Sequence, residues 1–283
     1  MQNNSIRNNL TKDDIISDIK LCMSAEIQEH KMYIVVEGED DINLLNEYFN
    51  GNVYLYESFD GKNGVEQIVN QFFSKYKNVI GIRDKDYLST PSSNKIFFYD
   101  NCCQEMMLIQ NNEVFNGLYF EFYKGNLEKE ELRNKIFSEL KYLSIIRKLN
   151  ETENLGIKIN GVSINNAWLV NEEVIQNNVI VDKINSMNAG CIDESLRTQF
   201  DNEWQIEWED RDYYNFTQGH DYFALFATIC NSHSNQGISY KMLESVARCS
   251  FRFHDFIKTS LYSALVYYGE KHNVEFLNKL EMS

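Results

Sequence analysis

Residues 30 to 112 alternate between short apolar runs and helical patterns, and this alternation constrains the fold more than any other feature of the sequence. The apolar runs predict four strands, at 32–36, 53–56, 79–82 and 96–99. The helical patterns predict helices at 40–49, 64–75 and 104–110. Strands and helices that alternate at this spacing favour a parallel sheet with right-handed crossovers, because each parallel pair needs a connection over one face of the sheet. We therefore expect an α/β fold with helices flanking the sheet.

The sequence after residue 112 has a different pattern, in which helical periodicity dominates. Apolar spacing predicts helices at 127–149, 172–187, 218–233, 239–248, 252–271 and 274–281. A small hairpin is expected at 157–164, because apolar residues alternate around Asn160-Gly161. We divide the chain into three regions: a polar lead-in followed by a helix at 1–30, an α/β domain at 31–112, and a mainly helical C-terminal domain at 113–283.

Apolar run length and cysteine usage bear on the compartment. No apolar run approaches the roughly 20 residues that a membrane span needs. The first 30 residues contain no apolar signal core. None of the six cysteines forms a CxxC pair, and no histidine lies at zinc-ligand spacing from them. This pattern favours reduced, mostly buried thiols. We therefore expect a cytoplasmic protein with no membrane partner.

The formal net charge of −15 disfavours strong autonomous binding to nucleic acid, because phosphate contacts usually show as a basic surface. Chemistry on phosphates stays possible in two ways. Bound divalent cations reverse the local sign of an acidic site. Alternatively, a basic partner subunit supplies the contacts to the phosphates.

Acidic residues follow three of the predicted strands. Glu37 comes directly after the first strand, Asp84 and Asp86 follow the third, and Glu105 lies just after the fourth. Because ligands bind outside the carboxyl ends of strands in open parallel sheets, we expect these carboxylates to converge. Asp84 and Asp86 are two residues apart, which puts both on the same side of an extended segment. Carboxylates gathered at one point favour Mg²⁺ or Mn²⁺, and such a site supports phosphodiester cleavage.

Basic and histidine residues near these acids have a functional and a structural interpretation each. Arg83 and Lys85 bracket Asp84; they either balance charge or contact the scissile phosphate, and Lys85 is kept as a candidate catalytic residue. Lys62, near a predicted helix start, is a weaker candidate for a phosphate contact. His220 and His254, each followed by an aspartate, are more typical of structural pairs. An aromatic group at 204–216 fits base stacking, an interface or a core equally well.

Glu37-Gly38 after the first strand and Asp84-x-Asp86 after the third resemble the Toprim domain of topoisomerases, primases and overcoming-lysogenization-defect nucleases. The Glu37-to-Asp41 spacing resembles the nuclease branch. A helical remainder containing Gly219-His220-Asp221 looks like stand-alone Toprim proteins encoded beside an ATPase, and the chain resembles the Toprim effector subunit of PARIS-type anti-phage defence.

The resemblance implies a Toprim-like catalytic domain at 31–112. Its implied metal ligands are Glu37, Asp41, Asp84 and Asp86, together with Glu105. It also implies an ATPase sensor that releases the nuclease on infection, a homodimer when active, and cleavage of host transfer RNA. Acidic residues at a helix start are favoured by the helix dipole, so a structural role for Asp41 is an open alternative.

The sequence thus predicts a magnesium- or manganese-dependent phosphodiester endonuclease, and the resemblance implies that it acts as a toxic defence effector. Two alternatives stay open. The chain is instead a non-catalytic Toprim-fold binding subunit whose acidic surface docks a basic ATPase, or it is a DNA nickase or repair nuclease. Fold alone does not distinguish them.

Overall fold

The computed structural model describes residues 11–25, 31–234 and 236–279. The chain divides into two compact units. The sheet unit comprises Met1–Asp100 and Arg252–Ser283, and the helical unit comprises Asn101–Phe251. The end of the chain thus belongs to the sheet unit, whereas the predicted division at residue 112 places it in the C-terminal domain. Residues 1–10 and 26–30 of the predicted lead-in lie outside the described residues.

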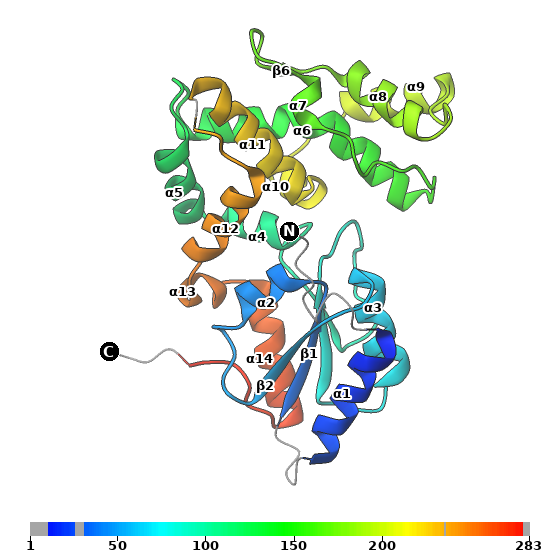
Figure 1. Ribbon diagram of the computed structural model, residues 1–283, viewed down its shortest axis with the longest axis vertical. Helices are drawn as coiled ribbons and strands as arrows, with labels where there is room; N and C mark the ends of the chain where they lie inside the picture. The colour runs from blue at the N-terminus through cyan, green and yellow to red at the C-terminus, as the bar shows by residue number, and fades with distance from the viewer. Residues whose placement is uncertain (1–10, 26–30, 235, 280–283) are drawn as a thin grey trace. The chain divides into compact units, whose positions relative to one another are not determined.

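The sheet unit contains a four-stranded parallel sheet (Figure 1). Its strands are β1 (Met32–Val36), β2 (Val53–Glu57), β3 (Val79–Arg83) and β4 (Ile96–Phe98). The strand order is β2-β1-β3-β4, and Tyr33 pairs with both Tyr54 and Val79 across β1. All five residues of β1 and of β3 are buried, as expected of central strands covered on both faces. The predicted α/β class and the parallel sheet flanked by helices are confirmed.

One face of the sheet is covered by α1 (Lys12–Ala25), by α3 (Gly61–Gln67) and by the π-helical turn η2 (Ile68–Phe72) that continues α3. Their apolar side chains form one buried cluster with alternate residues of the strands. The cluster contains Ile15, Ile16, Ile19, Tyr33, Val35, Val65, Ile68, Val69, Phe73, Val79 and Ile96. Gly81 of β3 permits this packing, because a Cβ there would lie 2.5 Å from Cγ1 of Val65.

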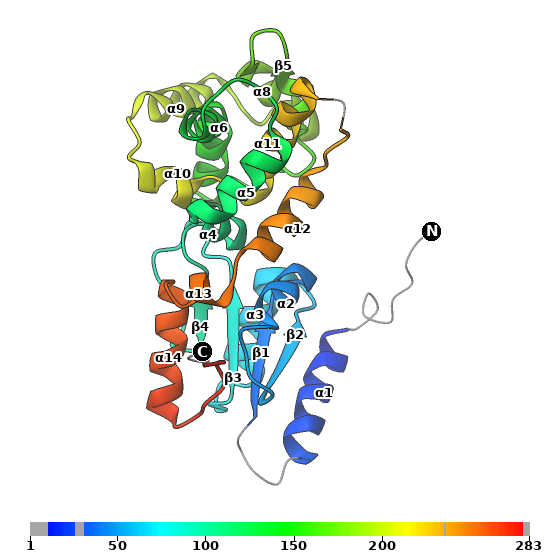
Figure 2. The same cartoon turned by 90° about the vertical axis from the view of Figure 1, so that its left-hand side faces the viewer.

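The opposite face carries α2 (Glu39–Leu45), α13 (Phe253–Phe256) and α14 (Ser260–His272). Figure 2 shows α1 and α14 on opposite sides of the sheet. Phe97 of β4 meets Tyr268 of α14 edge to face, with ring centroids 5.5 Å apart. The carboxylate of Asp100 accepts hydrogen bonds from the amides of Ser260 and Leu261, at 2.9 and 3.0 Å, so the start of α14 is tied to the end of β4.

Two expectations for the end of the chain are wrong. The predicted helix at 252–271 is divided into α13 and α14. The predicted helix at 274–281 is absent over its described part, 274–279. The cause lies at Asn273, whose φ of 54° ends α14, and in the backbone pairing that follows. The amide of Asn278 donates to the Tyr48 carbonyl at 2.9 Å, which gives the segment a partner outside any helix.

The helical unit contains nine α-helices in its described part and one short antiparallel pair. The helices are α4 (Gln104–Gln110), α5 (Asn112–Phe122), α6 (Lys129–Thr152), α7 (Ile164–Ala167), α8 (Asn177–Met187), α9 (Glu194–Gln205), α10 (Asp210–Phe216), α11 (Gly219–His233) and α12 (Tyr240–Ser250). The pair is β5 (Trp168–Leu169) with β6 (Val174–Ile175). None of the helices that the structure describes is long and apolar enough to cross a membrane.

The hairpin predicted at 157–164 is wrong, although a turn does form there. Val162 donates its amide to the Ile159 carbonyl at 3.2 Å. The flanking backbone is bound by side chains instead of by a facing strand: Asn150 accepts from the Ile157 amide and Asn188 from the Lys158 amide, both at 2.8 Å. Side-chain partners of this kind compete with a ladder for the same backbone groups.

Candidate functional site

Acidic residues from two neighbouring strands meet at the carboxyl edge of the sheet. Glu37 directly follows β1, and Asp84 directly follows β3, the strand that pairs with β1. The backbone amide of Asp84 donates a hydrogen bond to Oε1 of Glu37 at 2.8 Å. The structure therefore brings together two of the chain segments that the sequence predicts to converge.

Glu37 is half-buried in this position. Burial raises the pKa of its carboxyl, and the negative charge of Asp86 acts in the same direction. The amide of Asp84 and the positive charges of Arg83 and Lys62 act against this rise in the pKa of Glu37. A cation placed at Glu37 would offset the cost of burying its charge.

Asp86 is held in an unusual backbone conformation, with φ at 51°. Left-handed backbone is uncommon for a residue other than glycine, though aspartate tolerates it better than most. Oδ2 of Asp86 accepts from Nζ of Lys62 at 3.0 Å and from Nη2 of Arg83 at 3.2 Å. Two cations thus already contact this carboxylate and fix its orientation.

Arg83 ends β3, and its side chain is only 5 % exposed. Its guanidinium donates from Nε to the carbonyl of Asp84 at 2.9 Å and from Nη1 to Oε1 of Glu66 at 3.3 Å. The guanidinium carbon also lies 5.5 Å from the ring centroid of Phe98. Arg83 therefore has a packing role in addition to its contacts with the acids. Lys85, the other cation beside Asp84, is half-buried.

Asp41 is buried at the start of α2, and both of its carboxylate oxygens are engaged. Oδ2 accepts from the amide of Gly38 at 2.9 Å, and Oδ1 accepts from the hydroxyl of Tyr99 at 2.7 Å. The first contact caps the helix, and the second joins α2 to the segment after β4. Tyr99 could not be identified from sequence, because 58 residues separate it from Asp41.

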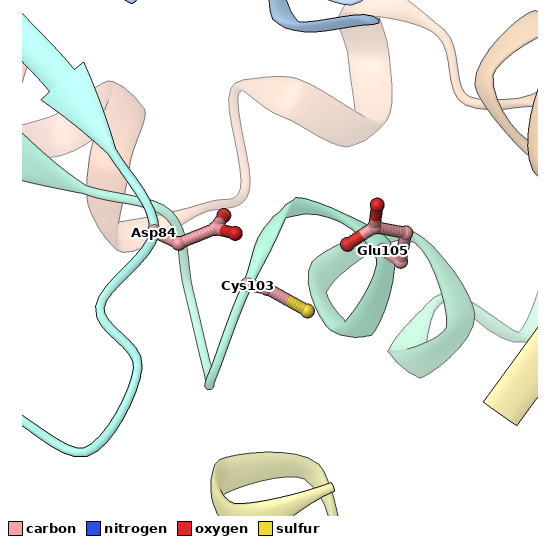
Figure 3. Close-up of side chains that lie close together, drawn as sticks. All are labelled: Asp84, Cys103 and Glu105. Carbon is pink, nitrogen blue, oxygen red and sulfur yellow. The ribbon is translucent and has the colours of Figure 1, made fainter. Parts of the chain in front are cut away.

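Glu105 lies in the helical unit, in the first turn of α4. Figure 3 labels Cys103 and Glu105 at the start of this helix and Asp84 directly after β3 in the sheet unit. Within the helical unit, the ligand atoms of Glu105, His220 and Glu244 all lie within 4.8 Å of one another. Glu244, on α12, was not singled out by sequence, because it has the spacing of an ordinary helix residue.

The predicted ligands at the sheet edge are gathered without forming a tight cluster. A tight cluster is taken as three or more potential ligands whose ligand atoms all lie within 4.8 Å of one another. Among the residues that the structure describes, neither Glu37 nor Asp86 belongs to such a cluster. Glu37 touches the Asp84 backbone, and Asp86 turns toward Lys62 and Arg83.

The two histidine–aspartate pairs noted in the sequence have structural partners. Asp221, after His220, forms a two-pronged ion pair with Arg147, at 2.6 and 3.0 Å. Asp255, after His254, is buried, and its carboxylate accepts a hydrogen bond from the amide of Arg252 at 3.1 Å. This contact caps α13.

The aromatic group of the helical unit is divided between buried and exposed members. The Trp208 ring lies 5.3 Å from Tyr213 and 5.4 Å from Phe216, and Trp208 is buried. Trp204 keeps a large exposed fraction. Packing therefore accounts for the buried tryptophan.

No protein-family model matches this sequence, and a search of curated proteins finds no match either.

Proposed function

We propose that the chain is a Toprim-type, metal-dependent phosphodiester endonuclease whose active site lies at the carboxyl edge of the sheet. One observation carries the proposal: the Asp84 amide after β3 donates to the Glu37 carboxylate after β1. This contact brings acidic residues of two adjacent parallel strands to the edge where open α/β sheets bind ligands. The strand order β2-β1-β3-β4 is consistent with a Toprim-like layout.

The donor set at this edge fits a hard divalent cation. Glu37, Asp84 and Asp86 offer carboxylate oxygens, which suit Mg²⁺ or Mn²⁺, and burial raises the pKa of Glu37 in a way that a cation would offset. Such an ion lowers the pKa of water and stabilises a leaving oxygen. Asp41 and Glu105 are proposed as ligands on the resemblance alone. Asp41 would have to exchange its contacts with Gly38 and Tyr99 to take this role.

The protein's own cations have two tasks in the proposed reaction. Arg83, which is buried, orients Asp86 and the Asp84 carbonyl. Lys62 and Lys85 are more accessible and are proposed to contact the phosphate of the substrate. In hydrolysis, water adds its oxygen to phosphorus, the bond from phosphorus to the leaving oxygen breaks, and that oxygen gains a proton.

The biological setting is proposed from the resemblance. The chain would act in the cytoplasm as the toxic effector of an anti-phage system, would dimerise once released from an ATPase sensor, and would cleave host transfer RNA. The net charge of −15 fits a basic partner or a site whose acids are neutralised by cations, since it disfavours direct binding to nucleic acid.

The test is digestion of transfer RNA and supercoiled DNA, side by side, by purified chain with Mg²⁺ or Mn²⁺. We expect the wild type to cleave transfer RNA, and we expect Glu37→Gln and Asp84→Ala to abolish cleavage without loss of folding. Glu39→Gln is the matched control, because Glu39 is an exposed acid two residues from Glu37. Normal cleavage by Asp84→Ala with metal present would refute the site.

A non-catalytic binding subunit is the second candidate, favoured by the engagement of Asp86 with two cations and of Asp41 with Gly38 and Tyr99. Folded wild type that binds an ATPase partner but cuts neither nucleic acid over a range of Mg²⁺ and Mn²⁺ would support it. Cleavage of supercoiled DNA alone would identify a nickase or repair nuclease instead.

A further inference from the structure

Glu66 follows no strand and matches no motif, yet its carboxylate contacts both ends of the loop between β3 and β4. Oε1 accepts a hydrogen bond at 3.3 Å from Nη1 of Arg83, the last residue of β3 before that loop. Oε2 accepts from the hydroxyl of Ser92, near its end, and from Nδ2 of Asn70 at 2.8 Å. Each oxygen of one carboxylate thus serves a different end of the segment that carries Asp84 and Asp86.

The contacts at the near end lead directly to the candidate site. Arg83 divides its N–H groups among Glu66, Asp86 and the Asp84 carbonyl. A guanidinium is planar and rigid, so fixing one edge of it fixes the direction of the others. Glu66 therefore sets the direction from which Arg83 reaches Asp86.

The contacts at the far end fasten the loop to the same helical segment. Asn70, in the π-helical turn η2, donates to the hydroxyl of Ser92 at 2.9 Å and accepts from the hydroxyl of Ser93 at 2.6 Å. These contacts do not include Arg83. The two ends of the loop can therefore be altered independently.

We propose that Glu66 is a positioning residue of the candidate site, which acts through Arg83 to hold Asp86 and the Asp84 carbonyl in place. The inference rests on the proposed function. Arg83 forms ion pairs with Glu66 and Asp86, so loss of the charge of Glu66 leaves Asp86 as its acidic partner among the described residues. The guanidinium then competes more strongly with a cation for that carboxylate, so metal affinity falls.

The experiment compares Glu66→Gln with Ser92→Ala in the full chain. Mn²⁺ is titrated by calorimetry, and kcat and KM are measured on transfer RNA. Glu66→Gln is expected to weaken Mn²⁺ affinity by about 10-fold and to lower kcat more than it raises KM, as for other groups that orient metal ligands. Ser92→Ala removes a contact to the same carboxylate but spares Arg83, and it should leave Mn²⁺ affinity at the wild-type value.

The outcomes separate this inference from the proposed function. If Glu66→Gln weakens Mn²⁺ binding although the wild type cuts nothing, the positioning role stands and the nuclease proposal fails. If the wild type cuts and Glu66→Gln binds Mn²⁺ as tightly as the wild type does, the positioning role is refuted and the nuclease proposal stands. Equal losses in Glu66→Gln and Ser92→Ala would show a general loop effect and overturn the inference. A wild type that binds no Mn²⁺ would overturn both.

Discussion

Each of the two units contains an arginine that is largely removed from solvent and paired with acidic residues, and the two arginines are used differently. In the helical unit, Arg147 of α6 gives two hydrogen bonds to a single carboxylate, that of Asp221 on α11. In the sheet unit, Arg83 divides its hydrogen bonds among Glu66, Asp86 and a backbone carbonyl. The first arrangement is a two-pronged contact with one carboxylate, and the second is a branched network that leads to the sheet edge.

The difference indicates how a buried charge relates to function. In a two-pronged pair, each charge is held by the other in a fixed geometry, so we expect its effect to be on stability. In the branched network, the acidic partners of Arg83 are themselves shared with Lys62, Asn70 and Ser92. A change at a residue that contacts Arg83 directly therefore alters the direction of its other contacts. We expect substitutions in the pair to act on folding and substitutions of the side chains that bind Arg83 to act on the site.

Asp221→Ala should have the largest effect on stability. It leaves the Arg147 guanidinium, only 16 % exposed, without its two-pronged partner. Removing one member of a buried pair typically costs about 3 kcal/mol or more. Urea denaturation of Asp221→Ala beside the exposed control Asp182→Ala measures this difference. A loss no larger than in the control would contradict the structural role of the pair.

Lys95→Met should have the next largest effect, and it tests whether every buried cation of the sheet unit serves the site. Nζ of Lys95, a residue only 8 % exposed, contacts the carbonyls of Val69, Phe73 and Tyr76 at 3.2, 2.6 and 3.4 Å. Burial lowers the pKa of Lys95, so these contacts must offset the cost of the buried charge. Carbonyls left without a partner should cost about 2 kcal/mol.

The measurement for Lys95→Met is denaturation together with Mn²⁺ titration, with the exposed Lys75→Met as control. We expect stability to fall and Mn²⁺ affinity to stay at the wild-type value. Weaker Mn²⁺ binding with unchanged stability would place Lys95 in the network of Arg83 and would break the distinction drawn above.

The strands and the position of Glu37 were predictable because both depend on local sequence. A continuously apolar run is typical of a strand buried on two faces, as β1 is, and the residue after such a strand lies at the sheet edge by topology. The helix after Gly64 was predictable from its apolar spacing. Its π-helical turn was not, because the turn depends on packing and on contacts from distant residues such as Lys95.

The partners of the acidic residues could not be predicted, because they are far apart in the chain. Tyr99 meets Asp41 over 58 residues, and Ser92 meets Glu66 over 26. The same reason explains why the helix predicted at 274–281 is wrong over its described part, 274–279, where the backbone pairs with residues near Tyr48 instead of with itself. Sequence patterns report which face a residue occupies, whereas hydrogen-bond partners depend on how distant segments meet.

Glu37→Gln should have the smallest effect on stability, and it should stabilise the protein where the two preceding substitutions destabilise it. The pKa of Glu37 is raised in the folded protein from its ordinary value of 4.5. The folded protein therefore binds a proton at this carboxyl more tightly than the unfolded chain does. The contribution of the protonated form to stability is therefore present below that value and is lost as the pH rises through the folded pKa. Glutamine keeps an oxygen for the Asp84 amide and does not ionise, so the variant avoids this loss.

Glu37→Gln should thus match the wild type in stability at pH 4 and exceed it slightly at pH 7, as is common when an ionisable group is held for function. Thermal unfolding at several pH values measures the difference, with Glu39→Gln as the control for loss of an exposed charge. A stability difference that does not grow between pH 4 and pH 7 would show that Glu37 carries no cost of burial. The sheet edge would then be as well satisfied as the Arg147–Asp221 pair, and the contrast between the two units would no longer hold.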